Sequence, residues 1–533
     1  MFTYLITAEN AEHAERLKGS KSMMGRRGKR KLAWPSWAGE AAWAGGLVLL
    51  LGIWLGGQGP LGLPGQWEVR VHPPLWSSCL LAVGGVLVGW GGLAGYGTYL
   101  LYRRATPRLA KVWTALVLFA LVCLVFSLQL TLHFLAEAPL FWLIASTWSD
   151  VSNEYFSLAY TVSDPREFVR TYPDLMPQAQ YHVATHPPGA VLVYWLGWQL
   201  FRRVPGLTSW LTTATENWLG LSLSLFRQNL LTIPAMPDLP EEAVPAALWC
   251  SLLLAFCGAL TVVLVYRLGT LLRDRTTGLV AAGLFSTVPS LLFFFSTLDQ
   301  LLLLLATTTL WGLVEGLVGK RWWASALAGG VWGGALFISF GMLPVGLWVL
   351  LMVALYGVTR RLSGREAVKH GVAFLSGMGG LWLGLALAWA WQPVATLRLG
   401  LAAHAQVNVG FQRTYGTWVG LNLLMFAVFL GLPLSVQVLR SGRDLPRLVR
   451  EGDGIALLFA AALTTLLLLD LSGQVRAEVE RIWLFLMPPF ALWAARWLHE
   501  RPAGEFRLTA TLAFQLTQLL LMGLTLPPLV RPY

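Results

Sequence analysis

A polar segment near residue 150 carries side chains that could transfer a group between oxygen atoms. Asp150 and Glu154 are four residues apart, so their carboxylates point the same way if a helix starts there. Asn153 and Tyr155 beside them could orient a sugar. A carboxylate in such a place can take the proton from a hydroxyl that attacks a sugar carbon. The simpler interpretation is that Asp150 caps the following helix and that Glu154 is a solvated surface charge.

The same segment ends in a motif that suits a phosphate. Thr185-His186-Pro187-Pro188-Gly189 leads into an apolar run, and its prolines fix the direction in which a helix would start. Helix starts bind phosphate well, so we expect His186 to lie beside a phosphate. Transfer from a lipid-phosphate sugar requires such a place, because charge develops on the leaving phosphate. The alternative for His186 is packing at the membrane interface.

Further cations lie in segments that we expect on the same side of the membrane. Positive charge in the loop 392–417 runs against the usual orientation rule, which favours a phosphate partner there. The candidates for phosphate or substrate binding, besides His186, Asn153 and Tyr155, are Arg398, His404, Arg413 and Arg481.

Two acidic residues at helix junctions are additional candidates. Asp299 is interpreted first as a helix cap, and Glu480 as part of a rim ion pair with Arg481. No firm ligand spacing predicts a metal site, although Asp150, Glu154 and His186 could hold a divalent ion. No other cofactor is expected.

The elements that position these residues are predicted to be membrane-spanning helices. Of the 533 residues, 56% are hydrophobic and only 12% are charged, with a mean hydropathy of +0.60. A soluble protein carries about twice that charged fraction. Apolar runs recur between short Arg-rich connectors, and each is close to the about 20 residues that a helix needs to cross a bilayer. The sequence therefore predicts an all-α polytopic membrane protein.

We expect about 13 transmembrane helices, with interfacial helices in a large first outer loop at 137–243. The run 188–203 is short and starts at two prolines, so it is predicted to lie in the interface, as is a second helix over 207–232. This choice places the later basic connectors in the cytoplasm. Spans are predicted at 39–57, 78–101, 112–136, 244–267, 277–295, 298–317, 323–340, 342–359, 370–391, 418–438, 453–471, 482–497 and 506–526.

Charge also suggests orientation and domain organisation. The chain has a net charge of +12, placed mostly beside helix ends, where it meets anionic lipid and not nucleic acid. We expect a multi-pass protein of the cell (inner or plasma) membrane, with the N-terminus in the cytoplasm and the C-terminus outside. Its predicted parts are a basic cytoplasmic tail at 1–38, two additional helices at 39–111, a catalytic core at 112–500, and a final helix with a short outer tail at 501–533.

The first outer loop resembles that of the GT-C class of integral-membrane glycosyltransferases, which includes the protein O-mannosyltransferases and the aminoarabinose transferases. The matching stretches are Asp150-Val-Ser-Asn-Glu-Tyr-Phe and Thr185-His186-Pro187-Pro188-Gly189, and the resemblance covers roughly residues 112–500. It implies a catalytic base at Asp150, with Glu154 as the second choice, and a contact between His186 and the lipid phosphate. Those families often have two adjacent acidic residues, whereas Asp150 and Glu154 are spaced.

The function that the resemblance implies is a hexosyl- or pentosyltransferase of the non-cytoplasmic face. It would move a sugar from a polyprenyl-phosphate-linked donor to an acceptor protein, lipid or glycan. The alternatives are a transporter or flippase of lipid-linked glycans, and a ligase or polymerase of surface polysaccharide. A transporter should show charges deep within its spans or two related halves, and the sequence shows neither. Such polymerases place their main loop late in the chain, whereas here it is early.

Overall fold

The computed structural model describes most of the chain beyond residue 106. The predicted tail 1–38 and the predicted span 39–57 lie outside the described residues, as does 78–101 apart from Gly84. The predicted outer tail after residue 525 also lies outside them. The described residues are 84, 107–135, 138–179, 181–233, 236–410, 413–500 and 504–525.

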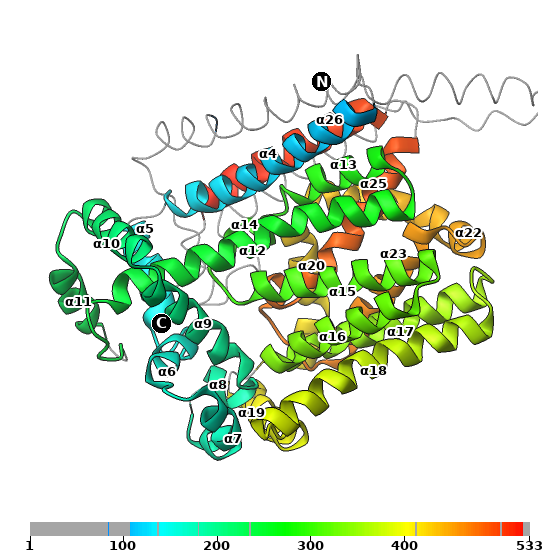
Figure 1. The fold of residues 1–533 in the computed structure, drawn as a ribbon. Coiled ribbons are helices and arrows are strands. Elements are labelled where there is room, and N and C mark those ends of the chain that lie inside the picture. The colour runs from blue at the N-terminus through cyan, green and yellow to red at the C-terminus, as the bar shows by residue number, and fades with distance from the viewer. Residues whose placement is uncertain are drawn as a thin grey trace, which may run out of the picture.

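All regular elements in the described part are helices, and Figure 1 shows the long ones lying side by side. The segment between α4 (Pro107–His133) and α12 (Ala243–Leu272) is called the first loop here; its short helices gather at one end of the bundle. They are α5 (Pro139–Trp148), α6 (Tyr155–Thr161), α7 (Pro165–Leu175), η2 (Met176–Gln178), α8 (Tyr181–Thr185), α9 (Gly189–Arg203), α10 (Pro205–Leu219) and α11 (Leu223–Leu231).

The remaining helices complete the bundle. They are α13 (Arg275–Phe285), α14 (Pro289–Phe293), α15 (Asp299–Gly319), α16 (Trp322–Ile338), η3 (Phe340–Met342), α17 (Leu343–Val358), α18 (Gly364–Trp389), α19 (Pro393–Gly410), α20 (Tyr415–Leu430), α21 (Leu432–Ser441), η4 (Gly442–Asp444), α22 (Leu445–Arg450), α23 (Gly454–Ser472), α24 (Val479–Ile482), η5 (Leu484–Leu486), α25 (Met487–Glu500) and α26 (Gly504–Thr525).

Six helices of the described residues are long and apolar enough to cross a membrane, which makes the chain a multi-pass membrane protein. A seventh crossing is obtained if the bent pair of α20 with α21–α22 counts as one span. The predicted number of 13 is not confirmed. The six are Lys111–His133, Ala243–Leu272, Asp299–Gly319, Phe340–Val358, Gly364–Trp389 and Gly454–Ser472.

Several predicted spans are shorter or broken in the structure. The run 277–295 is divided into α13 and α14, because the hydroxyls of Ser286 and Thr287 bond to carbonyls of the preceding turn. Pro289 then starts α14 in a new direction. α16 has only 17 residues, and α25 starts at Met487, after the 3-10 turn η5, instead of near residue 482.

The predicted span 418–438 bends by 108° at Gly431, whose φ of 101° lies in a region that favours glycine. Two glutamines of α26 pair the backbone groups that the break exposes. Gln515 Nε2 donates to the Leu430 carbonyl at 3.3 Å, and Gln518 bonds both the Val428 carbonyl and the Leu432 amide at 2.8 Å. Within a membrane such groups must find partners in the protein, so α26 holds this bend.

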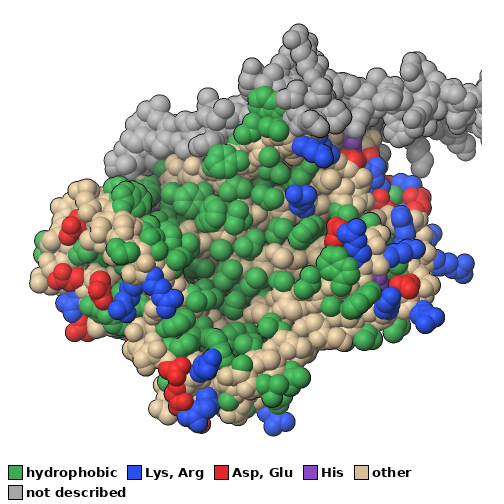
Figure 2. Space-filling view, viewed as in Figure 1, with side chains coloured by type: hydrophobic (Ala, Val, Ile, Leu, Met, Phe, Trp, Pro, Cys, Tyr) green, Lys and Arg blue, Asp and Glu red, His purple; other side chains and the backbone are tan. Residues whose placement is uncertain are grey.

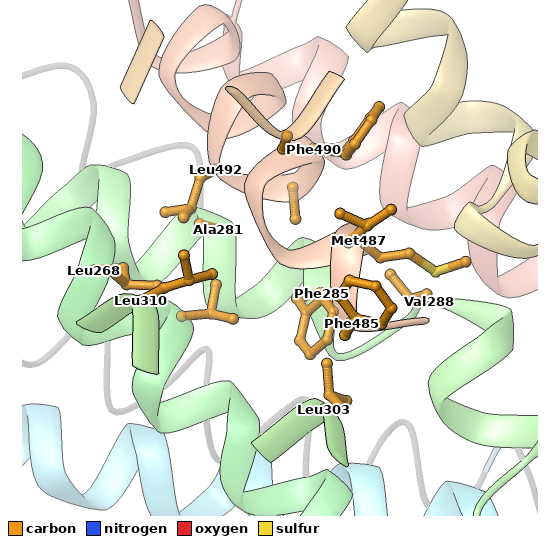
Figure 3. Packing of buried hydrophobic residues seen from close by; sticks show 14 of the residues in the cluster. Leu268, Ala281, Phe285, Val288, Leu303, Leu310, Phe485, Met487, Phe490 and Leu492 are labelled. Carbon is orange, nitrogen blue, oxygen red and sulfur yellow. The ribbon is translucent and has the colours of Figure 1, made fainter. Parts of the chain in front are cut away.

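Small residues and a large apolar core hold the bundle together. A Cβ on Gly329 of α16 would lie 1.8 Å from the Phe374 carbonyl oxygen of α18, so these helices approach closely because glycine is there. Figure 3 shows buried side chains of α12, α13 and α15, among them Phe285 and Leu303, packed against Phe485 and Leu492 near and within α25. In Figure 2 charged side chains gather toward the ends of the molecule, and the middle of that face is largely hydrophobic.

The first loop folds into a compact layer with its own apolar core. Its α9 spans Gly189–Arg203, close to the predicted 188–203, and packs on α6, α12 and α16. The predicted helix 207–232 is two helices, α10 and α11, divided at Gly220, which has a φ of 68°. The layer brings α6 and α8 to the end of the bundle where α15 begins and α23 ends.

An ion network closes the other end of the bundle. Arg273, directly after α12, meets Asp453 and Glu500, and Arg496 of α25 meets the same two carboxylates. These four residues, the opposite-end network, join the end of α12, the start of α23 and α25.

Candidate active site

Asp150 lies in the turn after α5, half-buried, with its carboxylate accepting a hydrogen bond from Ser157 Oγ of α6. Burial raises the pKa of Asp150, and the Ser157 hydrogen bond works in the opposite direction. A carboxylate with a raised pKa is a better proton acceptor once it is ionised. The turn is fixed by Asn153, whose buried amide donates to the Thr147 carbonyl at 3.1 Å.

Glu154 connects this turn to α8. It starts α6 with a left-handed φ of 46°, an uncommon conformation for a side chain other than glycine. Its Oε2 accepts a hydrogen bond from the Val183 amide at 3.2 Å. The carboxylate therefore holds the backbone of the helix that carries His182 and leads to His186.

Two tyrosines hold the same segment from other sides. Tyr155, with only 5% exposure, lies 5.8 Å from the His186 ring and 6.0 Å from the His182 ring between centroids. Tyr172 of α7 donates to the Val183 carbonyl at 3.2 Å and to the His186 carbonyl at 2.9 Å. The aromatic rings and their hydroxyls thus fix the place of both histidines.

The hydrogen bonds of His186 assign its tautomer. Nδ1 lies 2.9 Å from Thr185 Oγ1 and 3.1 Å from the His182 carbonyl, which can only accept, so the proton is on Nδ1 and Nε2 carries the lone pair. Burial, followed by the neighbouring His182, lowers the pKa of His186 to about 3. The ring is therefore neutral at ordinary pH, and Nε2 can accept a hydrogen bond or a proton.

His182 is a residue that the sequence analysis did not single out. It precedes His186 by one helical turn, with 6.5 Å between the ring centroids. Burial and the nearby Arg481 lower the pKa of His182 to about 4. The i, i+4 spacing to His186 is the signal by which the sequence could have indicated it.

Four charged residues from distant parts of the chain meet beside the histidines, and we call them the site-end cluster. Arg481 Nη1 lies 3.3 Å from Asp299 Oδ2, and its Nη2 lies 2.9 Å from Glu478 Oε2. Arg413 Nη2 lies 3.1 Å from the other Glu478 oxygen. Three of the predicted candidates, Asp299, Arg413 and Arg481, therefore belong to one cluster.

The charges in the site-end cluster control one another. Burial alone would lower the pKa of Arg481, but the Asp299 and Glu478 carboxylates overcome it and raise that pKa. Burial would raise the pKa of Glu478, but Arg481 and Arg413 hold it at about 2. Arg481 is therefore held as a cation and Glu478 as an anion.

Glu480 is a buried carboxyl next to the cluster, with 4% exposure. Burial raises its pKa to about 7, and the negative charge of Glu478 acts in the same direction. Its backbone carbonyl accepts a hydrogen bond from Ser290 Oγ, which fixes α24 against α14. The group is half-protonated near neutral pH, unlike the charged residues beside it.

The other predicted residues lie at the margin of the site or outside it. His404 Nε2 pairs with the Gln474 carbonyl at 2.9 Å, and His404 is a minor cause of the lowered pKa of His186. Arg398 is exposed on α19, and no hydrogen bond or ion pair joins it to another described residue. A Cβ on Gly189 would lie 2.3 Å from the Phe337 carbonyl oxygen, so α16 covers the first turn of α9.

No contact among the described residues joins Asp150 directly to Arg481 or to a histidine; the connection runs through α6. Ser157 holds Asp150, and Tyr155 two residues earlier faces His182 and His186. Within the described part of the chain, no three His, Cys, Asp or Glu side chains come close enough to hold a metal ion. What the arrangement offers chemically is a proton acceptor and a fixed cationic group, bridged by a short helix.

Comparisons with known proteins give a limited picture. No protein-family model matches the chain, and no curated protein matches it by sequence. Among solved structures, the chain is similar to the crystal structure of the Archaeoglobus fulgidus oligosaccharyltransferase in complex with Zn and sulfate. The TM-score is 0.43 and the sequence identity 13%, over 76% of this chain and 53% of that one. The chain thus spans about half the length of that oligosaccharyltransferase.

Proposed function

We propose that this chain is a glycosyltransferase of the GT-C type, which moves a sugar from a polyprenyl-phosphate-linked donor to an acceptor hydroxyl. The observation that carries the proposal is the position of a half-buried carboxylate and a fixed cationic group at one end of a membrane bundle. The lipid phosphate would lie at that end of the bundle, and the donor's chain would extend along the apolar helices.

Asp150 acts as the base in this proposal. It takes the proton of the acceptor hydroxyl while the hydroxyl oxygen attacks the anomeric carbon. The bond from that carbon to the phosphate oxygen breaks, and its electron pair stays on the phosphate. The Ser157 hydrogen bond keeps the carboxylate in one orientation. Glu154 is the alternative base, although its bond to the Val183 amide favours a role in positioning α8.

The phosphate side of the reaction belongs to Arg481 and Arg413. Two carboxylates hold the Arg481 guanidinium in place, so it needs no reorganisation when negative charge develops on the leaving oxygen. Arg413, with a side chain only 10% exposed, supports Glu478 from the other side and adds a second positive charge. His404 and Arg398 would contribute only at the margin.

The direct test uses the full-length protein in lipid nanodiscs with polyprenyl-phosphate mannose, glucose or arabinose. Release of polyprenyl phosphate, with and without a membrane fraction as acceptor, would be followed by mass spectrometry. Release by the wild type and none by Asp150→Asn supports the proposal; donors that stay intact with the wild type contradict it. Movement of an intact lipid-linked sugar across vesicles would instead favour a flippase.

We also propose that the site end faces away from the cytoplasm. The opposite end carries exposed basic residues such as Arg360 and Arg447, in keeping with the orientation rule. Gln228 in α11 and Arg447 in α22 are both exposed, so a cysteine at either position can report its side. A membrane-impermeant thiol reagent added to intact cells should label Gln228→Cys and spare Arg447→Cys. The reverse pattern would contradict this orientation.

A further inference from the structure

The two histidines of the first loop form a pair without an acidic partner. Nothing in the described part of the chain bonds to the His182 ring, and for His186 only Nδ1 is engaged. Buried or partly buried imidazoles in proteins usually pair with a carboxylate, a carbonyl or water. Among the described residues, three ring nitrogens of this pair have no hydrogen-bond partner, and they lie near the cation of Arg481.

The groups around His182 and His186 explain why both rings are neutral, and they indicate that a bound anion would favour protonation. On His182 and His186, burial and the positive charge of Arg481 favour the neutral rings. An incoming anion would act in the opposite sense, because an opposite charge within about 4–6 Å shifts a pKa by about 1–3 units. The titratable or charged groups on the elements around the pair are Glu154, Tyr155, Tyr172, Tyr194, Asp299, His404, Glu478 and Arg481.

We propose that His182 and His186 together bind one phosphate oxygen of the lipid-linked donor, and that the pair takes up one proton when the donor binds. This inference rests on the proposed glycosyltransferase function. The geometry suits it: an oxygen with two hydrogen bonds of about 2.8 Å bridges nitrogens up to about 5.6 Å apart. The ring centroids are 6.5 Å apart, so one oxygen can bridge the pair when the Nε2 atom of His186 and a ring nitrogen of His182 turn toward it.

The proton has a use in the reaction. A donor phosphodiester carries one negative charge, and breaking the sugar–oxygen bond leaves a phosphate monoester with a second one. The proton held by the imidazole pair stabilises that developing charge and can pass to the phosphate oxygen, whose second pKa is about 6. The pair then returns to its neutral state, and one proton goes to Asp150 from the acceptor hydroxyl. Atoms and charges balance across the step.

The test is calorimetric binding of a simple phosphodiester to the full-length protein in detergent. Farnesyl methyl phosphate keeps one negative charge from pH 5 to 8 and has no titrating proton, so any proton uptake belongs to the protein. Titrations in buffers of different ionisation enthalpy measure that uptake directly. We expect uptake approaching one proton at pH 5.5, and binding about tenfold weaker at pH 8, because one pKa unit corresponds to a factor of ten in binding.

Variants identify the group that takes the proton. His182→Gln and His186→Gln should each weaken binding about tenfold and flatten its pH dependence, because glutamine can form hydrogen bonds but cannot titrate. His499→Gln, at the far end of α25, is the matched control and should behave like the wild type. Thermal unfolding of each variant in the same detergent shows whether the fold is retained.

The outcomes separate the two proposals. Binding of the probe without proton uptake, or with unchanged affinity in a folded His182→Gln variant, overturns the histidine-pair inference and leaves the glycosyltransferase proposal standing. A wild type that binds the probe no better than uncharged farnesol contradicts a phosphate site altogether, and the proposed function then fails with it.

Discussion

Each end of the bundle carries an ion network of two arginines and two carboxylates. The two networks differ in the titratable groups that lie around them. In the opposite-end network, two arginines face two carboxylates, and Arg496 and Asp453 are 7% and 19% exposed at their side chains. Each charge there has its counter-charge within the protein. Such a network joins the helices that carry its members.

The site-end cluster also has two arginines and two carboxylates, but groups with shifted pKa values lie beside it or are connected to it through α6. His182 and His186 are kept neutral, Glu480 has a pKa near 7, and the pKa of Asp150 is raised. Groups with shifted pKa values in one place are typical of functional sites, because burial without a partner costs stability. The difference makes the site end, and not the opposite end, the candidate for a functional site.

The strongest test of this comparison replaces one aspartate with asparagine at each end of the bundle. Asp150→Asn should lower turnover of the lipid-linked donor by about a thousandfold, since the side chain can no longer accept a proton, and leave the melting temperature near that of the wild type. Asp453→Asn should lower the melting temperature and leave turnover per folded molecule near that of the wild type. Turnover per folded molecule and thermal unfolding measure the two effects. Near-normal turnover in Asp150→Asn would move the base to Glu154.

The second test removes one arginine from each network. Arg496→Met leaves Arg273 as the one remaining arginine of the opposite-end network, and should lower the free energy of unfolding by about 1–3 kcal/mol, because two charged hydrogen bonds are lost. Arg481→Met should cost less stability, because the Arg481 side chain is 26% exposed, but should weaken phosphodiester binding strongly. Chemical unfolding and calorimetry check this pair. Weakened phosphodiester binding in Arg496→Met would contradict the distinction between the two networks.

The third test uses pH. The pKa of Glu480 is raised to about 7 in the folded protein, so its contribution to stability is fully present below pH 4.5 and is lost as pH rises through 7. The expected loss between those limits is about 3 kcal/mol. The melting temperature should fall from pH 5 to 8 in the wild type and fall less in Glu480→Gln. Glu478→Gln is the control, because the Glu478 pKa of about 2 lies outside that range.

The smallest effect is expected for Glu154→Gln. A glutamine oxygen still accepts a hydrogen bond from the Val183 amide, so the free energy of unfolding should drop by only about 1 kcal/mol. Turnover should stay within about tenfold of the wild type if Glu154 positions α8 and Asp150 is the base. A loss as large as that of Asp150→Asn would assign the base to Glu154.

Much of the helical framework could be predicted from the sequence. The spans at 244–267, 298–317, 370–391 and 453–471 agree closely with α12, α15, α18 and α23, because long apolar runs have few alternatives in a bilayer. The breaks within 277–295 and at Gly431 could not be predicted, since both depend on side chains that pair exposed backbone groups. For Gly431 those partners are glutamines about 85 residues later in the chain.

The candidate site shows the same division. Its residue types and the place of the first loop followed from charge, proline and spacing, because those are local properties. The meeting of Asp299 with Arg481, 182 residues apart, was decided by packing of α15 against the segment after α23. His182 and the coverage of the α9 start by Phe337 were decided in the same way. The sequence thus determines which side chains are available at the site. Tertiary packing determines which of them are buried, which are paired and which can meet a ligand, because each of these depends on neighbours from distant parts of the chain.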